Sequence, residues 1–93
     1  MTPRDNNGQE PTSDLNSLRV NLLVLYSPRL EECESFYSHL GLRFATEQHG
    51  QGPRHYAATL ANGTVFEIYP ARSGHETGAL RLGLTVVGIA ATR

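Results

Sequence analysis

The sequence predicts an α+β fold: a single βαβββ module with a fifth strand, forming a mixed, curled sheet with one helix on its outer face. Three observations predict it. One segment carries apolar residues at helical spacing, several others have the composition of strands, and an Asn-Gly pair joins two of these strands. The 93 residues suffice for one small domain and not for two.

Met1–Ser17 is predicted to be a disordered leader, and residues 18–93 to form the module. The leader holds only two apolar side chains, Met1 and Leu15. So little apolar surface cannot offset the entropy of ordering the backbone, about 1–2 kcal/mol per residue.

Composition excludes several classes of function. The net charge of −1 gives no electrostatic reason to bind nucleic acid or an anionic membrane. The chain has no Lys for a Schiff base and one cysteine, Cys33, which allows neither an internal disulfide nor a thiolate metal cluster. No apolar run approaches 18 residues, and the leader lacks the apolar segment of a signal peptide. A cytoplasmic protein is therefore expected.

The first strand and the helix come from adjacent segments. Arg19–Tyr26 is apolar on both faces and is expected to be an interior strand. Ser27 and Pro28 then indicate a helix start, and Gly41 its left-handed end. The expected helix has one apolar stripe, formed by Leu30, Cys33, Phe36, Tyr37 and Leu40.

The remaining strands follow in order. Leu42–His49 alternates apolar and polar residues, His55–Ala61 and Thr64–Tyr69 flank Asn62-Gly63, and Leu80–Val87 alternates as the fifth strand. Gly50-Gln51-Gly52-Pro53 is a turn across which His49 and His55 approach each other. We interpret these two histidines as polar residues at the tip of a hairpin, since their spacing makes no metal motif.

A two-residue turn at Asn62-Gly63 fixes which residues share a face. Leu60 would then oppose Val65, Ala58 would oppose Glu67, and Tyr56 would oppose Tyr69, all on one face. Phe66 and Ile68 would lie on the other face, against the helix. Glu67 would project away from the helix, near the two tyrosines.

These residues resemble the vicinal oxygen chelate superfamily, which contains glyoxalases, bleomycin-resistance proteins and extradiol dioxygenases. The resemblance spans Arg19 to Val87 and lies in LLVLYSPRLEECESFYSHLGLRF, HYAATLANGTVFEIYPA and LRLGLTV. In that family one βαβββ module is half of a domain, and two modules surround a shared cleft. Here only one module is complete, and Ile89–Arg93 resembles the first helical turn of a second. The resemblance therefore implies either that a second chain completes the cleft, as in a homodimer, or that the sequence is a truncated half.

The resemblance also indicates how much of the family's metal site is present. Glu67 falls at a ligand position in the fourth strand. The first-strand position falls at Asn21 or Leu22, and the fifth-strand position at Arg81, and none of these is a suitable ligand. Because zinc or iron sites need three or more protein donors, no metal and no other cofactor is expected at the family position.

The sequence thus predicts a metal-free, small-molecule-binding protein of the glyoxalase and bleomycin-resistance type. Glu67 would accept a hydrogen bond or act as a base, with Tyr56 and Tyr69 as walls of the ligand site. Alternatively, Glu67 is solvated or paired with Arg81, and the tyrosines pack across strands. Two other functions stay open: a metal-dependent lyase or dioxygenase of the same superfamily, and a truncated half-module without independent activity. Whether the protein is an enzyme is left open.

Overall fold

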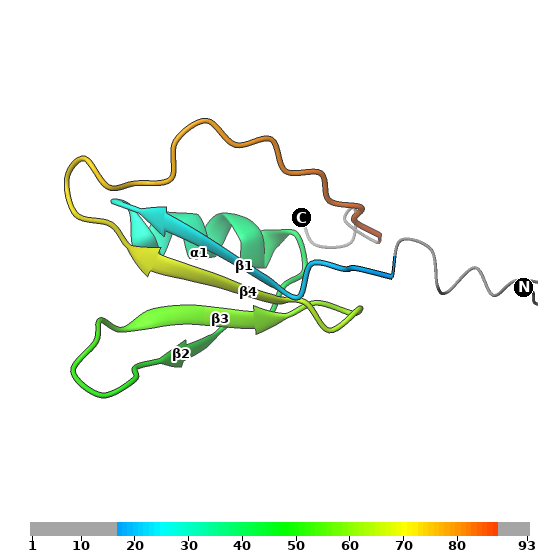
Figure 1. The fold of residues 1–93 in the computed structure, drawn as a ribbon, viewed down its shortest axis with the longest axis horizontal. Coiled ribbons are helices and arrows are strands. Elements are labelled where there is room, and N and C mark those ends of the chain that lie inside the picture. The colour runs from blue at the N-terminus through cyan, green and yellow to red at the C-terminus, as the bar shows by residue number, and fades with distance from the viewer. Residues whose placement is uncertain (1–16, 88–93) are drawn as a thin grey trace, which may run out of the picture.

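The computed structural model describes residues 17–87, which form one helix packed on one face of a four-stranded sheet (Figure 1). The predicted leader, apart from Ser17, and the predicted helical turn at Ile89–Arg93 lie outside the described residues. The strands are β1 (Leu22–Ser27), β2 (Ala45–Glu47), β3 (His55–Thr59) and β4 (Val65–Pro70), and the helix is α1 (Leu30–His39). The predicted α+β class and the βαβββ order are confirmed.

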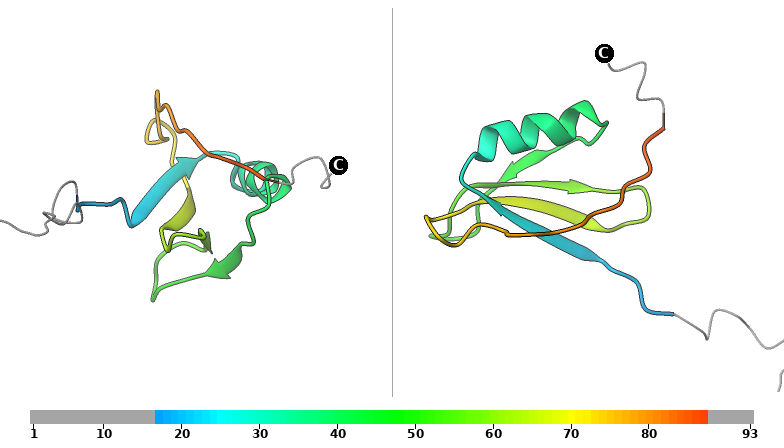
Figure 2. Two further views of the ribbon diagram at one scale, coloured as in Figure 1. Left: turned by 90° about the vertical axis from the view of Figure 1, so that its right-hand side faces the viewer. Right: turned by 90° about the horizontal axis from the view of Figure 1, so that it is seen from above.

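The sheet is mixed, with strand order β1-β4-β3-β2. β1 runs parallel to β4, while β3 is antiparallel to both β4 and β2. Two expectations are corrected here. β1 lies at a sheet edge and not in the interior, and the sheet is open and does not curl around a cleft (Figure 2). The expected curling depended on strands of a second module, which are not among the described residues.

The predicted fifth strand at Leu80–Val87 is wrong. Residues 80–87 form no strand and run toward the C-terminal end of α1 without pairing with the sheet. The free edge of β1 is met only locally: Tyr26 N–H donates to Thr77 Oγ1 at 2.8 Å, and Thr77 N–H donates to Tyr26 O at 2.9 Å. A segment with alternating apolar residues becomes a strand only when its backbone pairs along its length with the edge of a sheet.

α1 ends with the signal that the sequence contains, but it does not begin at the predicted cap. The Ser27 hydroxyl accepts the Arg29 N–H at 3.0 Å in the turn before the helix, whereas the N-cap residue is Arg29, which makes no side-chain cap bond. Glu31 and Glu32 occupy the first turn, where the helix dipole favours acids. At the other end, Gly41 has a φ of 112°. The N–H groups of Gly41 and Leu42 donate to Ser38 O and Tyr37 O, a Schellman motif that satisfies the last helical carbonyls.

The core lies between α1 and one face of the sheet. Phe66 and Ile68 are fully buried there, as predicted, and Leu25 joins them. The rings of Tyr37 and Phe66 meet edge to face at 4.8 Å. Phe36, expected in the buried stripe, is 59% exposed and instead contacts Tyr37 at the side of the helix.

The β3–β4 hairpin differs from the prediction by one residue. Leu60 N–H donates to Thr64 O, and Gly63 N–H donates to Leu60 O, so the loop has three residues and Gly63 adopts a φ of 94°. A type I turn followed by a left-handed glycine is the common alternative to a two-residue turn. Ala57 therefore opposes Glu67, and Ala58 opposes Phe66. Because side chains alternate between faces, a shift of one residue moves every β3 side chain to the other face relative to β4.

Candidate functional site

The candidate site lies on the face of the sheet opposite α1. Figure 2 shows that α1 covers only one face of the sheet. On the open face, Val24, Glu67 and Ala57 lie side by side, since they are partners in the strand register. No helix of residues 17–87 has the length and apolar character needed to cross a membrane.

A row of rings crosses the open face at the end where β1 and β4 finish and β3 starts. Tyr26 opposes Tyr69 in the parallel register, with ring centroids 5.6 Å apart. The Tyr69 ring stacks on His55 at 4.0 Å and 8° between planes, and the His49 ring lies 5.2 Å beyond His55. The row thus reaches from the edge strand β1 to the loop that follows β2.

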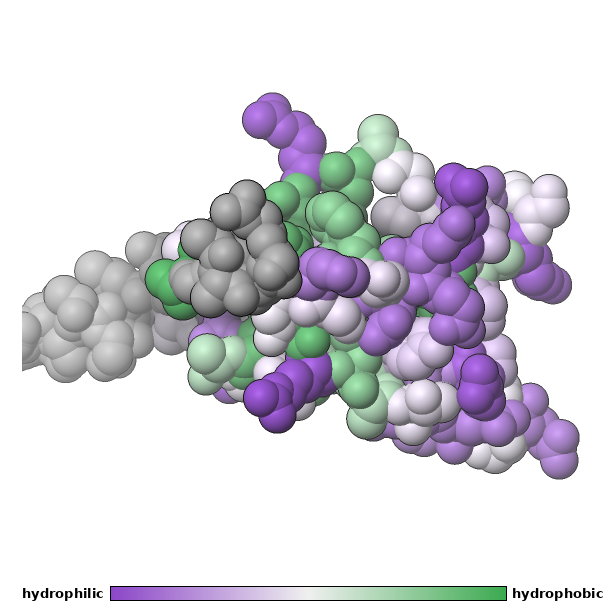
Figure 3. All heavy atoms as spheres, turned by 180° about the vertical axis from the view of Figure 1, so that it is seen from behind, coloured by the Kyte–Doolittle hydropathy of each residue, from purple (hydrophilic) through white to green (hydrophobic). Residues whose placement is uncertain are grey.

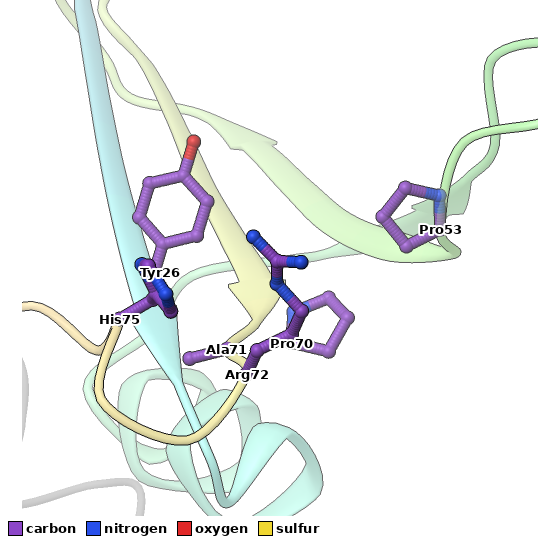
Figure 4. A pocket seen from close by; sticks show the side chains of 6 residues that line it. All are labelled: Tyr26, Pro53, Pro70, Ala71, Arg72 and His75. Atoms are coloured by element: carbon purple, nitrogen blue, oxygen red, sulfur yellow. The ribbon is translucent and has the colours of Figure 1, made fainter.

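A hollow of about 640 Å³ lies at the same end of the sheet. Tyr26 and Pro53 form two of its sides, and Arg72 and His75 from the loop after β4 reach it (Figure 4). The guanidinium of Arg72 rises between Tyr26 and Pro53 in this view. The hollow joins an aromatic wall to a cationic group.

The structure separates the three residues predicted to form the ligand site. Glu67 and Tyr69 are two residues apart on β4 and share the open face. Tyr56 is opposite Ile68 on the helix side, and its hydroxyl donates to Glu31 Oε1 at 2.6 Å. The prediction that Tyr56 opposes Tyr69, on the same face as Glu67, is wrong because the loop has three residues. Tyr26 takes the expected place of Tyr56 beside Tyr69.

The pKa values of Tyr56 and Tyr69 are both raised, for different physical reasons. The hydrogen bond to Glu31 is the main reason that the pKa of Tyr56 is raised. Burial is the main reason that the pKa of Tyr69 is raised, and the negative charge of Glu67 adds to it. Both phenols therefore stay neutral and able to donate hydrogen bonds well above neutral pH. Glu67 makes no ion pair with Arg81 among the described residues.

A second group of side chains lies at the end of the sheet where a loop joins β2 to β3. This group was not predicted from the sequence. Glu47 is the register partner of His55, and Glu47 Oε1 is 3.4 Å from Nε2 of both His49 and His55. His55 is 1% exposed, and its Nε2 has no hydrogen-bond partner. The approach of the two histidines across the Gly50–Pro53 turn is confirmed. The signal that was missed is Glu47, which a hairpin around this turn places opposite His55.

Comparisons with protein-family models, with curated proteins and with solved structures found no match to this chain. The family resemblance therefore stays a prediction, and the following proposals rest on the residues themselves.

Proposed function

We propose that the open sheet face binds a small organic molecule and that a second copy of the chain completes the binding cleft. The observation that supports this most directly is the combination of Glu67 with the Tyr26–Tyr69 pair on a face that α1 does not cover. An aromatic wall beside a single carboxylate favours a flat molecule that donates a hydrogen bond to the carboxylate.

The apolar surroundings of Glu67 support a binding role over simple solvation. Val24 and Ala57 flank the carboxylate on the neighbouring strands, and Val65 precedes it by two residues on the same face. Leu22 continues this apolar surface and is 52% exposed. A second copy of the chain would remove this surface from water, at about 25 cal/mol per Å² of apolar area.

The binding of a probe tests the ligand half of the proposal. Benzamidine, a flat aromatic cation, is titrated into the full chain in EDTA-containing buffer while amide NMR shifts are followed, and benzoate serves as the probe of opposite charge. Benzamidine is expected to shift residues of β1 and β4 and to bind more tightly than benzoate. Glu67→Gln should abolish this preference, whereas Glu76→Gln, an exposed acid in the loop after β4, should keep it. Equal binding of both probes, or a preference that survives Glu67→Gln, would contradict the proposal.

Sedimentation equilibrium tests the dimer. A mass of twice 10.2 kDa is expected, and Leu22→Arg should reduce it to that of one chain, because a charge then enters the shared apolar surface. Leu22 is half exposed, so this variant should still fold. A parent protein that stays monomeric at millimolar concentration would refute the shared cleft.

A further inference from the structure

We propose that Glu47, His49 and His55 bind one divalent transition-metal ion, of which Zn²⁺ is the best fit. The three side chains each present one ligand atom, and these atoms lie within 4.8 Å of one another. The set combines two imidazoles with one carboxylate, donors that Zn²⁺ commonly takes. It is distinct from the family position at Glu67, which lies on a different strand.

The orientation of the His55 ring is the main support for a metal site. Its Nδ1 lies 3.2 Å from Pro53 O. A backbone carbonyl can only accept, so Nδ1 bears the proton and Nε2 of the neutral ring has a free lone pair. A carbonyl that fixes the tautomer in this way is the usual outer partner of a metal-binding histidine.

The lone pair on His55 Nε2 faces another acceptor. Glu47 Oε1 lies 3.4 Å away, and Nε2 has no hydrogen-bond partner among residues 17–87. Leaving a buried polar atom unpaired destabilises the folded protein. A cation between these atoms removes that destabilisation, because both lone pairs then point at positive charge.

The distances fit a tetrahedral ion. With zinc–nitrogen and zinc–oxygen bonds of about 2.0–2.1 Å, two ligand atoms of a tetrahedral site lie about 3.3–3.4 Å apart. Glu47 Oε1 is 3.4 Å from Nε2 of both histidines, so two edges of the tetrahedron are already present. His49, whose side chain is 71% exposed, is free to close the third edge.

The fold holds the His55 ring in place as one ligand, and three protein ligands leave one coordination position of the ion open. Tyr69 stacks on the buried ring of His55 and holds it in place, so little side-chain entropy is lost when an ion binds. Three protein ligands leave a fourth position for water or for a small molecule, as in zinc sites that take part in chemistry. The cluster lies at the end of the aromatic row of the open face.

A proton shared between His55 and Glu47 is the competing explanation, and metal binding distinguishes the two. The full chain, free of any affinity tag and stripped with EDTA, is dialysed and titrated with ZnCl₂ in a calorimeter. Saturation at one ion per chain is expected. With Co²⁺ as the probe, intense visible absorption bands of a tetrahedral site should appear at the same stoichiometry. Absence of saturable binding of either ion would overturn the proposal.

Variants locate the ion. His49→Ala and Glu47→Gln each remove one exposed or half-exposed ligand without opening the core, and each should weaken zinc binding by at least about tenfold. His39→Ala and His75→Ala, outside the cluster, should bind zinc as the parent does. Parent-like binding by His49→Ala and Glu47→Gln, or loss of binding in either control, would overturn the assignment. The benzamidine titration is done in EDTA, so the two proposals fail independently.

Discussion

A disulfide between positions 59 and 65 tests the hairpin register on which the candidate site depends. Thr59 opposes Val65, and the neighbouring pair Leu60/Thr64 is bonded through its backbone. Thr59 and Val65 therefore form a non-hydrogen-bonded pair, in which side chains approach most closely. Thr59→Cys with Val65→Cys, in a Cys33→Ala background, is expected to form an intramolecular disulfide with oxidised glutathione.

The stabilisation follows from the length of the closed loop. Residues 59–65 form a seven-residue loop, and closing it in the unfolded chain is worth about 2.4 kcal/mol on the chain-entropy estimate. With a urea slope of about 1 kcal/mol per M for a domain of this size, the midpoint should rise by about 2 M upon oxidation. The reduced form of the same variant is the reference, so the cost of the substitutions themselves cancels.

A second cysteine pair makes the test decisive. Leu60→Cys with Val65→Cys matches the two-residue turn, in which these positions face each other, but in the structure they lie one position out of register. This pair is expected to remain reduced under the same conditions. A disulfide that forms between positions 60 and 65 and fails to form between 59 and 65 would refute the three-residue loop.

Three further predictions concern the turn, the core and a carboxylate–phenol pair. Gly63→Ala should lower the free energy of unfolding by about 1–2 kcal/mol in urea, because φ is 94° there, while Gly78→Ala, in open space, should stay within about 0.5 kcal/mol; equal losses would contradict this. Phe66→Ala should cost about 3–5 kcal/mol in a thermal melt, and an unchanged melting temperature would show that the core is elsewhere. Glu31→Gln should lower the pKa of Tyr56 toward 10.0 in an NMR titration. Because a raised phenol pKa stabilises the fold only while the proton is bound, the parent should lose stability above pH 10 and Glu31→Gln should lose less; an unchanged Tyr56 titration would contradict the hydrogen bond.

The features that were predicted correctly are those that depend on a few residues close together in the sequence. Gly41 at the end of α1 acts through hydrogen bonds within one turn. Phe66 and Ile68 were assigned to the face that packs on the helix, opposite to Glu67 on the same strand, and both are fully buried. These features need no information about the rest of the chain.

The predictions that were wrong concern features that depend on contacts between segments far apart in the sequence. Leu80–Val87 alternates like a strand, but it does not pair with the free edge of β1, and Leu80, Leu82 and Leu84 remain exposed. Seen from the helix side, apolar side chains gather toward the end of the molecule to which this segment runs, while hydrophilic ones dominate the β2–β3 end (Figure 3). Likewise, Asn-Gly is compatible with two loop lengths, and residues outside the turn select between them.

The loop length decides the chemistry of both faces. With a two-residue turn, Tyr56 would stand beside Tyr69 on the open face, and His55, its neighbour in sequence, would point toward α1. With the observed three-residue loop, His55 stacks on Tyr69 and meets Glu47, while Tyr56 donates to Glu31. Glu47 and His55 are partners between β2 and β3 whichever register β3 has with β4, but only the observed register stacks His55 on Tyr69 and places the cluster on the open face. A disulfide between positions 60 and 65 would therefore remove the support that Tyr69 gives to the His55 ring, whereas the zinc titration tests the three ligands themselves.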